Sequence, residues 1–161
     1  MKRLFPIALL CIVLLSTGCP IGLEVPLGNP GTEKIDKSLI GTWHCAECDD
    51  IITVKISKTS EMEYAVSVLE KGEMYSLEET EMQAWVTKVK GESFIYAKPV
   101  SEDKYYHYHY EMKGKELEIF DLALLAEGVD AATSTESLIK EVEASMDADD
   151  WGKEKKMWKK E

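Results

Sequence analysis

The chain has 161 residues, with 30 acidic and 19 basic side chains and a formal net charge of −11 at pH 7. This length is sufficient for one domain with a hydrophobic core. The excess of negative charge excludes nucleic acid as a partner, because phosphate contacts require a basic patch. The same charge predicts that anionic lipid headgroups repel the folded part of the protein.

The N-terminal residues have the pattern of a secretory signal peptide. A basic start is followed by an apolar run, Leu4–Leu15, and then by the small residues that precede Cys19. The run is too short for a helix that spans a bilayer, which needs about 20 apolar residues. The pattern therefore predicts that residues 1–18 are a signal peptide that is removed on export.

The segment that ends at Cys19 resembles the lipobox of bacterial lipoproteins. The resemblance implies that the Cys19 sulfur carries a diacylglycerol, with further acylation such as palmitate, and that the protein is anchored to the bilayer of the cell envelope. Removal of residues 1–18 leaves 143 residues and, with Lys2 and Arg3 lost, a formal charge of −13. Pro20 is not the aspartate that retains lipoproteins in an inner membrane, so the resemblance implies the outer membrane in a cell with two.

Two cysteines remain for the mature chain, because Cys11 leaves with the signal peptide and Cys19 is predicted to carry lipid. Outside the cytoplasm, a remaining pair favours a disulfide, here between Cys45 and Cys48. Free thiols are one alternative. A metal site shared with the histidines of a later strand is another, discussed below.

Residues 20–34 contain three prolines and three glycines. Such a composition is typical of a linker, so we expect residues 19–34 to be a lipidated cysteine with a flexible tether. The tether would hold the folded domain, residues 35–161, away from the membrane.

From residue 51 onward, apolar and polar residues alternate with the period of two that indicates β-strands. Lys-Gly pairs at residues 71–72, 90–91 and 113–114 predict tight hairpin turns between them. The runs with strand character are 51–57, 64–68, 74–79, 82–89, 93–99, 104–112 and 115–122. Consecutive strands joined by tight turns predict an antiparallel meander that hides its apolar face by closing into a small β-barrel.

The C-terminal part changes to a helical period. Leu138, Val142 and Met146 follow one another at steps of four, and Thr133 stands three residues before Glu136, as in a capping box. This pattern predicts one α-helix over residues 134–146, packed on the barrel wall or across the barrel mouth. The basic tail that follows is expected to be frayed or to pair as a last strand near Trp43.

The opening of this domain, with Gly41 and Trp43, resembles the Gly-x-Trp start of lipocalin-like (calycin) barrels. The order of later segments is similar to that of uncharacterised bacterial lipoproteins that share this opening; the segments are 94–96, His107, 114–120 and 133–138. The resemblance implies a mainly β, lipocalin-like barrel with a C-terminal α-helix. Lipocalins stack a basic residue over the opening tryptophan. Here only a lysine of residues 155–160 is available for that position.

A lipocalin-like barrel implies a protein that binds a small apolar or amphipathic molecule inside the barrel. We expect large apolar and aromatic residues of the strands to line the ligand site, namely Tyr64, Val66, Trp85, Phe94, Tyr106 and Tyr108. The alternative from the same residues is a closed core that these side chains fill completely.

One strand carries two histidines, His107 and His109, at positions that place both imidazoles on one face. Two such imidazoles are able to reach one zinc ion, and Glu111 on the same face would add a carboxylate. A metal site at His107 and His109 is therefore one hypothesis. Solvent-facing or polar-bonded histidines are the other.

The sequence contains no phosphate-binding glycine loop and no arrangement of nucleophile, base and acid that indicates catalysis. We therefore expect a binding protein without enzymatic activity or a cofactor. Besides a ligand-binding barrel, the negative charge is compatible with a module that binds or inhibits a cationic protein partner in the envelope.

Overall fold

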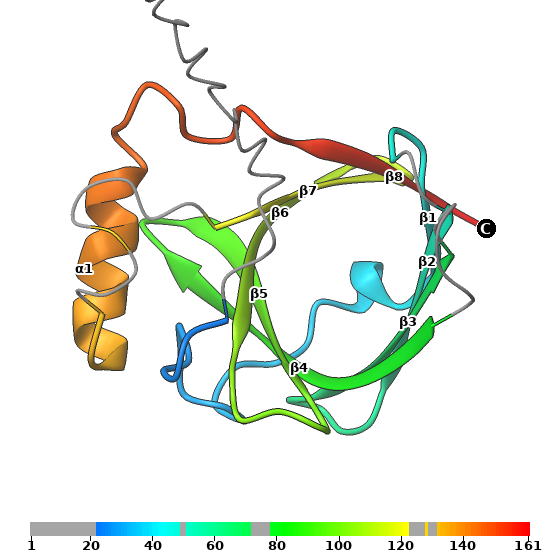
Figure 1. The fold of residues 1–161 in the computed structure, drawn as a ribbon, viewed down its shortest axis with the longest axis horizontal. Coiled ribbons are helices and arrows are strands. Elements are labelled where there is room, and N and C mark those ends of the chain that lie inside the picture. Colours follow the sequence, from blue (N-terminus) through cyan, green and yellow to red (C-terminus); the bar gives the residue numbers. More distant parts are fainter. Residues whose placement is uncertain (1–21, 49–50, 72–77, 123–127, 129–131) are drawn as a thin grey trace, which may run out of the picture.

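The computed structural model describes residues 22–48, 51–71, 78–122, 128 and 132–161. Within these residues, eight strands form one closed antiparallel barrel, in which each strand pairs with the next and the last pairs with the first (Figure 1). One α-helix lies outside the barrel wall. The predicted fold class, a mainly β antiparallel meander closed into a barrel and followed by a helix, is confirmed.

The chain order of the elements follows directly from the hairpin rhythm of the sequence. A short 3-10 helix precedes the first strand, and the α-helix is inserted before the last. The elements are η1 (Lys37–Leu39), β1 (Gly41–Cys45), β2 (Ile51–Lys58), β3 (Tyr64–Lys71), β4 (Glu78–Val89), β5 (Glu92–Pro99), β6 (Tyr106–Lys113), β7 (Glu116–Asp121), α1 (Thr135–Ser145) and β8 (Lys156–Lys160).

Two of the predicted hairpin turns have the backbone geometry that such turns require. Lys90 and Gly91 join β4 to β5 with φ angles of 48° and 89°, the left-handed pair of a two-residue turn. Gly114 between β6 and β7 has a φ of 68°. Gly72, of the third predicted turn, lies outside the described residues. The run 82–89 was expected to be a separate strand, but β4 already pairs from Glu78.

Strand β8 closes the barrel. The register places Trp43 of β1 opposite Lys160 and Cys45 opposite Trp158, while the other edge of β8 pairs with β7. The basic tail is therefore a strand that pairs beside Trp43, as one of the two sequence expectations had it. A disulfide joins Cys45 and Cys48 just beyond the end of β1, with their Cα atoms 5.6 Å apart.

The helix α1 packs on the outer wall of β4 and β5 rather than across the barrel mouth (Figure 1). Its buried Leu138 and Val142 are fully covered by this contact. The helix begins one residue later than predicted, because Ser134 is the N-cap and exchanges hydrogen bonds with Ser137 in a capping box. The predicted cap at Thr133 is therefore wrong by one residue.

The strands separate the apolar side chains into two clusters, one inside the barrel and one between the wall and α1. The inner cluster is centred on Trp43, Ile56, Tyr64, Val66, Ala84, Val86, Ile95, Tyr110 and Leu117. The outer cluster contains Leu27, Trp85, Val89, Phe94, Tyr96, Leu138 and Val142. Over residues 84–87 of β4 and 94–97 of β5 both faces are thus buried, which explains why these parts of the two strands lack an exposed polar face.

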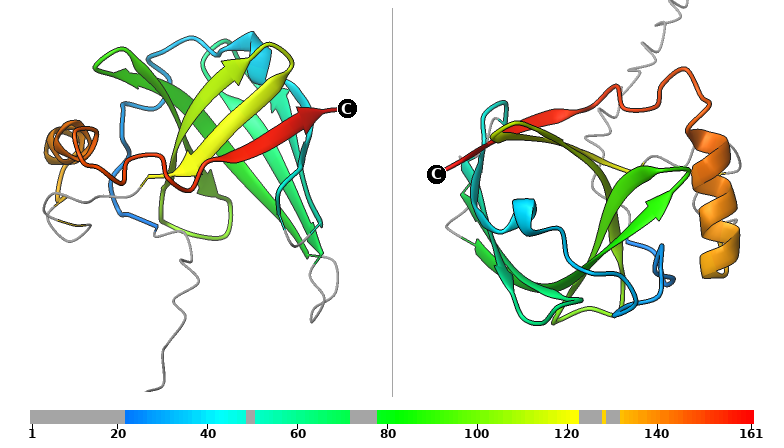
Figure 2. Two further views of the ribbon diagram at one scale, coloured as in Figure 1. Left: turned by 90° about the horizontal axis from the view of Figure 1, so that it is seen from above. Right: turned by 180° about the vertical axis from the view of Figure 1, so that it is seen from behind.

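The segment 22–34, here called the N-terminal strap, packs along the outer wall of the barrel (Figure 2). Leu23 and Tyr105 exchange two backbone hydrogen bonds of 2.9 and 2.7 Å, and Leu27 is completely buried in the outer cluster. Further along, Thr87 donates to the Glu33 carboxylate at 2.7 Å. The prediction of a flexible tether over residues 19–34 is therefore wrong for residues 22–34. Leu23, Val25 and Leu27 alternate with Glu24 and Pro26, a period of two that suits packing on a wall, although the prolines and glycines of this segment are typical of a linker.

Candidate ligand-binding site in the barrel

One end of the barrel, here called the plugged end, is closed by η1, which lies across the opening (Figure 2, left). Trp43 inside this end is 1% exposed, and its indole Nε1 donates to the Leu39 carbonyl of η1 at 2.8 Å. The Lys160 ammonium lies over the Trp43 ring, 5.1 Å from its centroid, and donates to the Ser38 carbonyl at 3.2 Å. A lysine thus takes the position over the opening tryptophan.

Asp36, which caps η1, fastens this plug to the barrel wall. The Tyr64 hydroxyl donates to the Asp36 carbonyl at 2.9 Å, and the Tyr110 hydroxyl donates to the Asp36 carboxylate at 3.3 Å. Burial raises the pKa of both tyrosines above the ordinary value, so they remain protonated donors. The polar groups of the plugged end are paired with one another, and this end has the character of a filled core.

The opposite end of the interior differs in burial. On five strands, the inward residue nearer the plug is buried, whereas the next inward residue away from the plug is partly exposed. The five pairs, buried member first, are Ile56 and Val54, Val66 and Val68, Ala84 and Met82, Tyr110 and Tyr108, and Leu117 and Ile119. Solvent therefore reaches apolar side chains of the interior from this end. At the plugged end, Ile40 and Met112 are also partly exposed, but no comparable series of strand pairs is found there among the described residues.

We name the partly exposed inward residues the mouth set: Val54, Val68, Met82, Tyr108, Ile119 and Trp158. Among the described residues, the Trp158 indole Nε1 is a buried donor with no hydrogen-bond partner. A buried unpaired donor is costly, about 1–3 kcal/mol, and an acceptor on a bound molecule would remove that cost. The mouth set combines an apolar lining with one unused donor, as small-molecule sites commonly do.

Two glutamates stand at the rim beyond the mouth set. Glu70 of β3 lies directly opposite Glu78 of β4, and each continues the inward alternation of its strand. Like charges placed directly opposite across a strand pair repel each other. The rim therefore carries negative charge where the polar end of a bound molecule would emerge.

The six predicted lining residues do not form one site. Tyr64 and Val66 face the interior but lie in the filled half, with 0% and 5% exposure. Tyr108 belongs to the mouth set. Tyr106 lies at the start of β6, where its hydroxyl donates to Glu102 at 2.8 Å.

Trp85 and Phe94 pack in the outer cluster beneath α1, so the expectation that they line the barrel interior is wrong. Their neighbours Ala84 and Ile95 take the inward positions of β4 and β5. Because both faces of these strands are buried, residue size does not indicate which face points inward. Trp158 was missed for a related reason: it stands in a short, lysine-rich strand whose pairing is set only by closure of the barrel.

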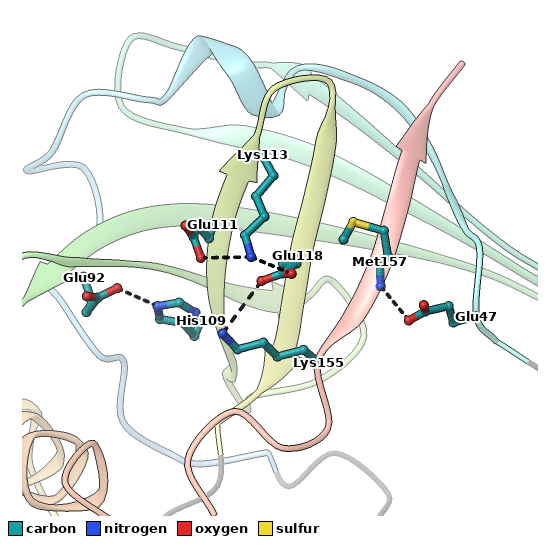
Figure 3. A network of polar contacts seen from close by, with 8 residues as sticks. All are labelled: Glu47, Glu92, His109, Glu111, Lys113, Glu118, Lys155 and Met157. Atoms are coloured by element: carbon teal, nitrogen blue, oxygen red, sulfur yellow. Dashed lines mark hydrogen bonds and ion pairs between the residues drawn. The ribbon is translucent and has the colours of Figure 1, made fainter.

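The two histidines of β6 lie on the outer face and are each only 5% exposed. They have different partners: His109 Nε2 lies 3.0 Å from the Glu92 carboxylate (Figure 3), whereas the His107 ring stacks on Tyr96 with 6.3 Å between centroids. Burial lowers the pKa of His107 to about 4, partly offset by a hydrogen bond to the Val25 backbone. Neighbouring positions on one strand thus have separate environments.

Glu111, the third ligand considered for a zinc ion, pairs instead with Lys113 at 3.8 Å on the exposed wall. Lys113 and Lys155 also flank Glu118 at 2.8 and 3.7 Å, which holds the pKa of Glu118 below its usual range (Figure 3). Within the described part of the chain, no three histidine, cysteine or acidic side chains are grouped as metal ligands. The hypothesis of a metal site shared with Cys45 and Cys48 is wrong, because these form a disulfide and β1 does not adjoin β6.

We compared the chain with models of protein families, with curated proteins and with solved structures, and none of them matches. In the ranges that the structure describes, no helix has the length and apolar character needed to cross a membrane. The assignment of function therefore depends on the sequence pattern and on the geometry of this barrel.

Proposed function

We propose that this protein is a lipid-anchored, extracytoplasmic lipoprotein whose barrel binds a small apolar or amphipathic molecule at the mouth set. One observation carries the ligand-binding part: inward residues are buried toward the plug and partly exposed away from it on five strands. Anchoring is supported by the apolar run and Cys19, which lie outside the described residues.

The chemistry of the mouth narrows the class of ligand. Val54, Val68 and Met82 offer aliphatic contact, and the Trp158 N–H offers one donor. The opposed Glu70 and Glu78 disfavour a carboxylate or phosphate at the rim. The ligand expected from this set has an apolar body, one hydrogen-bond acceptor and a neutral or cationic polar end.

Titration of the purified full-length protein with the neutral fluorescent probe N-phenyl-1-naphthylamine tests this proposal. The probe is expected to bind and to be displaced by dodecanol and dodecylamine, and more weakly by dodecanoate. A wild-type protein that binds none of these probes, and whose native mass spectrum shows no associated small molecule, would overturn the proposal.

A matched pair of variants on β2 tests where the ligand binds. Val54→Glu places a charge inside the mouth. Thr53→Glu places the same charge one residue earlier, on the outer face of the barrel wall. We expect Val54→Glu to abolish probe binding and Thr53→Glu to leave it unchanged. Equal binding by both variants would contradict a site at the mouth.

Trp158→Phe keeps an aromatic ring but removes the N–H donor, and it serves where Val54→Glu fails to fold. The affinity for dodecanol is expected to fall about tenfold, because the ligand oxygen loses its partner. Binding of the naphthylamine probe should stay the same. Unchanged dodecanol affinity would show that the Trp158 N–H does not contact the ligand.

A further inference from the structure

The described chain begins at the mouth end of the barrel. An added Cβ at Gly22 would lie 3.0 Å from Lys104 Cβ and 3.1 Å from the Tyr106 ring, so Gly22 is pressed against the start of β6. The next residue, Leu23, is held by its two backbone hydrogen bonds to Tyr105. Strand β6 starts at the mouth end and runs toward the plug, so these contacts fix residue 22 beside the mouth.

This contact limits how far the barrel is able to move from a lipid attached to Cys19. Gly22 lies three positions after Cys19. A fully extended chain spans about 3.6 Å per position, or about 11 Å in all. With the strap packed on the wall, no long tether separates the acylated cysteine from the domain. The mouth end must therefore lie near the headgroups of any bilayer that holds the anchor.

Two exposed apolar residues lie at the same end. Among the described residues, the large hydrophobic side chains that remain exposed are Ile51, at 66%, and Val100, at 75%. Ile51 begins β2 at the end farthest from η1, and Val100 follows the last residue of β5, at the end that lies toward the start of β6. Both therefore stand at the mouth end. A single exposed apolar residue is ordinary. Here two such residues, Ile51 and Val100, lie at the end of the barrel where the chain that follows Cys19 joins the wall.

We propose that the mouth end of the barrel rests on the lipid surface that holds Cys19, with Ile51 and Val100 in contact with lipid, so that the ligand passes between bilayer and barrel. This inference rests on the proposed anchoring and deepens the proposed ligand binding. The chain is acidic overall, and Glu70 and Glu78 stand at the same end, so the anchor and not charge attraction supplies the adhesion.

Tryptophan quenching by brominated lipid tests this orientation. The full-length protein is purified from membranes with its acyl chains and reconstituted in phosphatidylcholine vesicles, with and without bromine on the acyl chains. Val100→Trp and Ile51→Trp each add a fluorophore at the mouth end. Lys115→Trp adds one in the exposed turn between β6 and β7 at the plugged end and is the matched control.

We expect brominated vesicles to reduce the emission of Val100→Trp and Ile51→Trp beyond the loss seen in the parent protein, with Lys115→Trp equal to the parent. Equal quenching at both ends, or stronger quenching of Lys115→Trp, would overturn the orientation. A mass spectrum and a naphthylamine titration of the same preparation separate the causes. A missing acyl mass refutes the anchor and this inference together, whereas an acylated, probe-binding protein without mouth-end quenching refutes this inference alone.

Discussion

The two ends of the barrel interior use the same residue types for different purposes, and two tryptophans show the contrast. Trp43 at the plugged end is 1% exposed, its N–H is bonded to η1, and a lysine covers its ring. Trp158 is only partly buried, and its N–H lacks a partner among the described residues. The first end satisfies its polar groups within the chain. The second leaves apolar surface and a donor unused, which is the expected mark of a site for a molecule from outside.

The largest expected effect on the difference between the two ends comes from a variant of Trp43. Trp43→Ala is expected to lower the free energy of unfolding by about 3–5 kcal/mol, because it empties a buried position that the plug does not refill. Val54→Ala, at the position opposite Trp43 in the register, should cost only about 1 kcal/mol because Val54 is partly exposed. Urea denaturation of both variants measures the difference. Similar losses would contradict the distinction between a filled end and an open one.

The strap connects the two ends along the outer wall. The stability of a Leu27 variant tests whether the strap is part of the folded domain. Leu27→Ala should reduce the free energy of unfolding by about 2–5 kcal/mol, as for other fully buried leucines. Asn29→Ala, at an exposed strap position, is the control and should change stability by less than about 0.5 kcal/mol. Chemical denaturation decides the matter. A loss at Leu27 as small as that at Asn29 would restore the idea of a free tether.

Acid should loosen the wall where the strap reaches the mouth end. His107 is neutral in the folded protein, with a pKa near 4, against about 6.5 when unfolded. Protons therefore favour the unfolded chain, and the stability lost as the pH falls from 6.5 to 4 is about 3 kcal/mol from this group.

Among the described residues, the groups in contact with His107 include the Tyr96 and Tyr105 rings and the Val25 backbone, none of which is a carboxylate or an ammonium group. His107→Gln is expected to flatten the dependence of the melting temperature on pH between 6.5 and 4, relative to the wild type. Curves of equal slope for the two proteins would show that this histidine is not buried in the neutral form.

The smallest effect concerns Lys160 over Trp43. Lys160→Met keeps much of the side-chain volume but removes the charge over the ring, and should cost about 0.5–1 kcal/mol. Lys160→Arg should retain the stability, because a guanidinium also stacks on an aromatic face. The melting temperatures of the wild type and the two variants measure these effects. Equal values for the wild type and Lys160→Arg would support a stabilising cation over the Trp43 ring. A methionine variant as stable as the wild type would show that the contact contributes nothing.

The sequence alone determined the architecture. Period-two alternation and Lys-Gly turns are local properties, because side chains alternate across a strand and a left-handed turn needs glycine. They predicted the hairpins β4–β5 and β6–β7 and the closure of a mainly β barrel. The four-residue spacing of Leu138, Val142 and Met146 likewise predicted α1 within one residue at either end.

Only the tertiary structure decided which aromatic residues face inward, where the strap lies and which end stays open. Trp85 and Phe94 point outward because α1 and the strap cover that wall, so both faces of β4 and β5 are apolar around these two residues. Trp158 faces inward because β8 pairs with β1 and β7, residues far away in the chain. A local pattern predicts that buried residues alternate along a strand, but not which face of the strand points into the barrel. The side is set by contacts between distant segments, and those contacts place the filled half at η1 and the candidate ligand site at the opposite end.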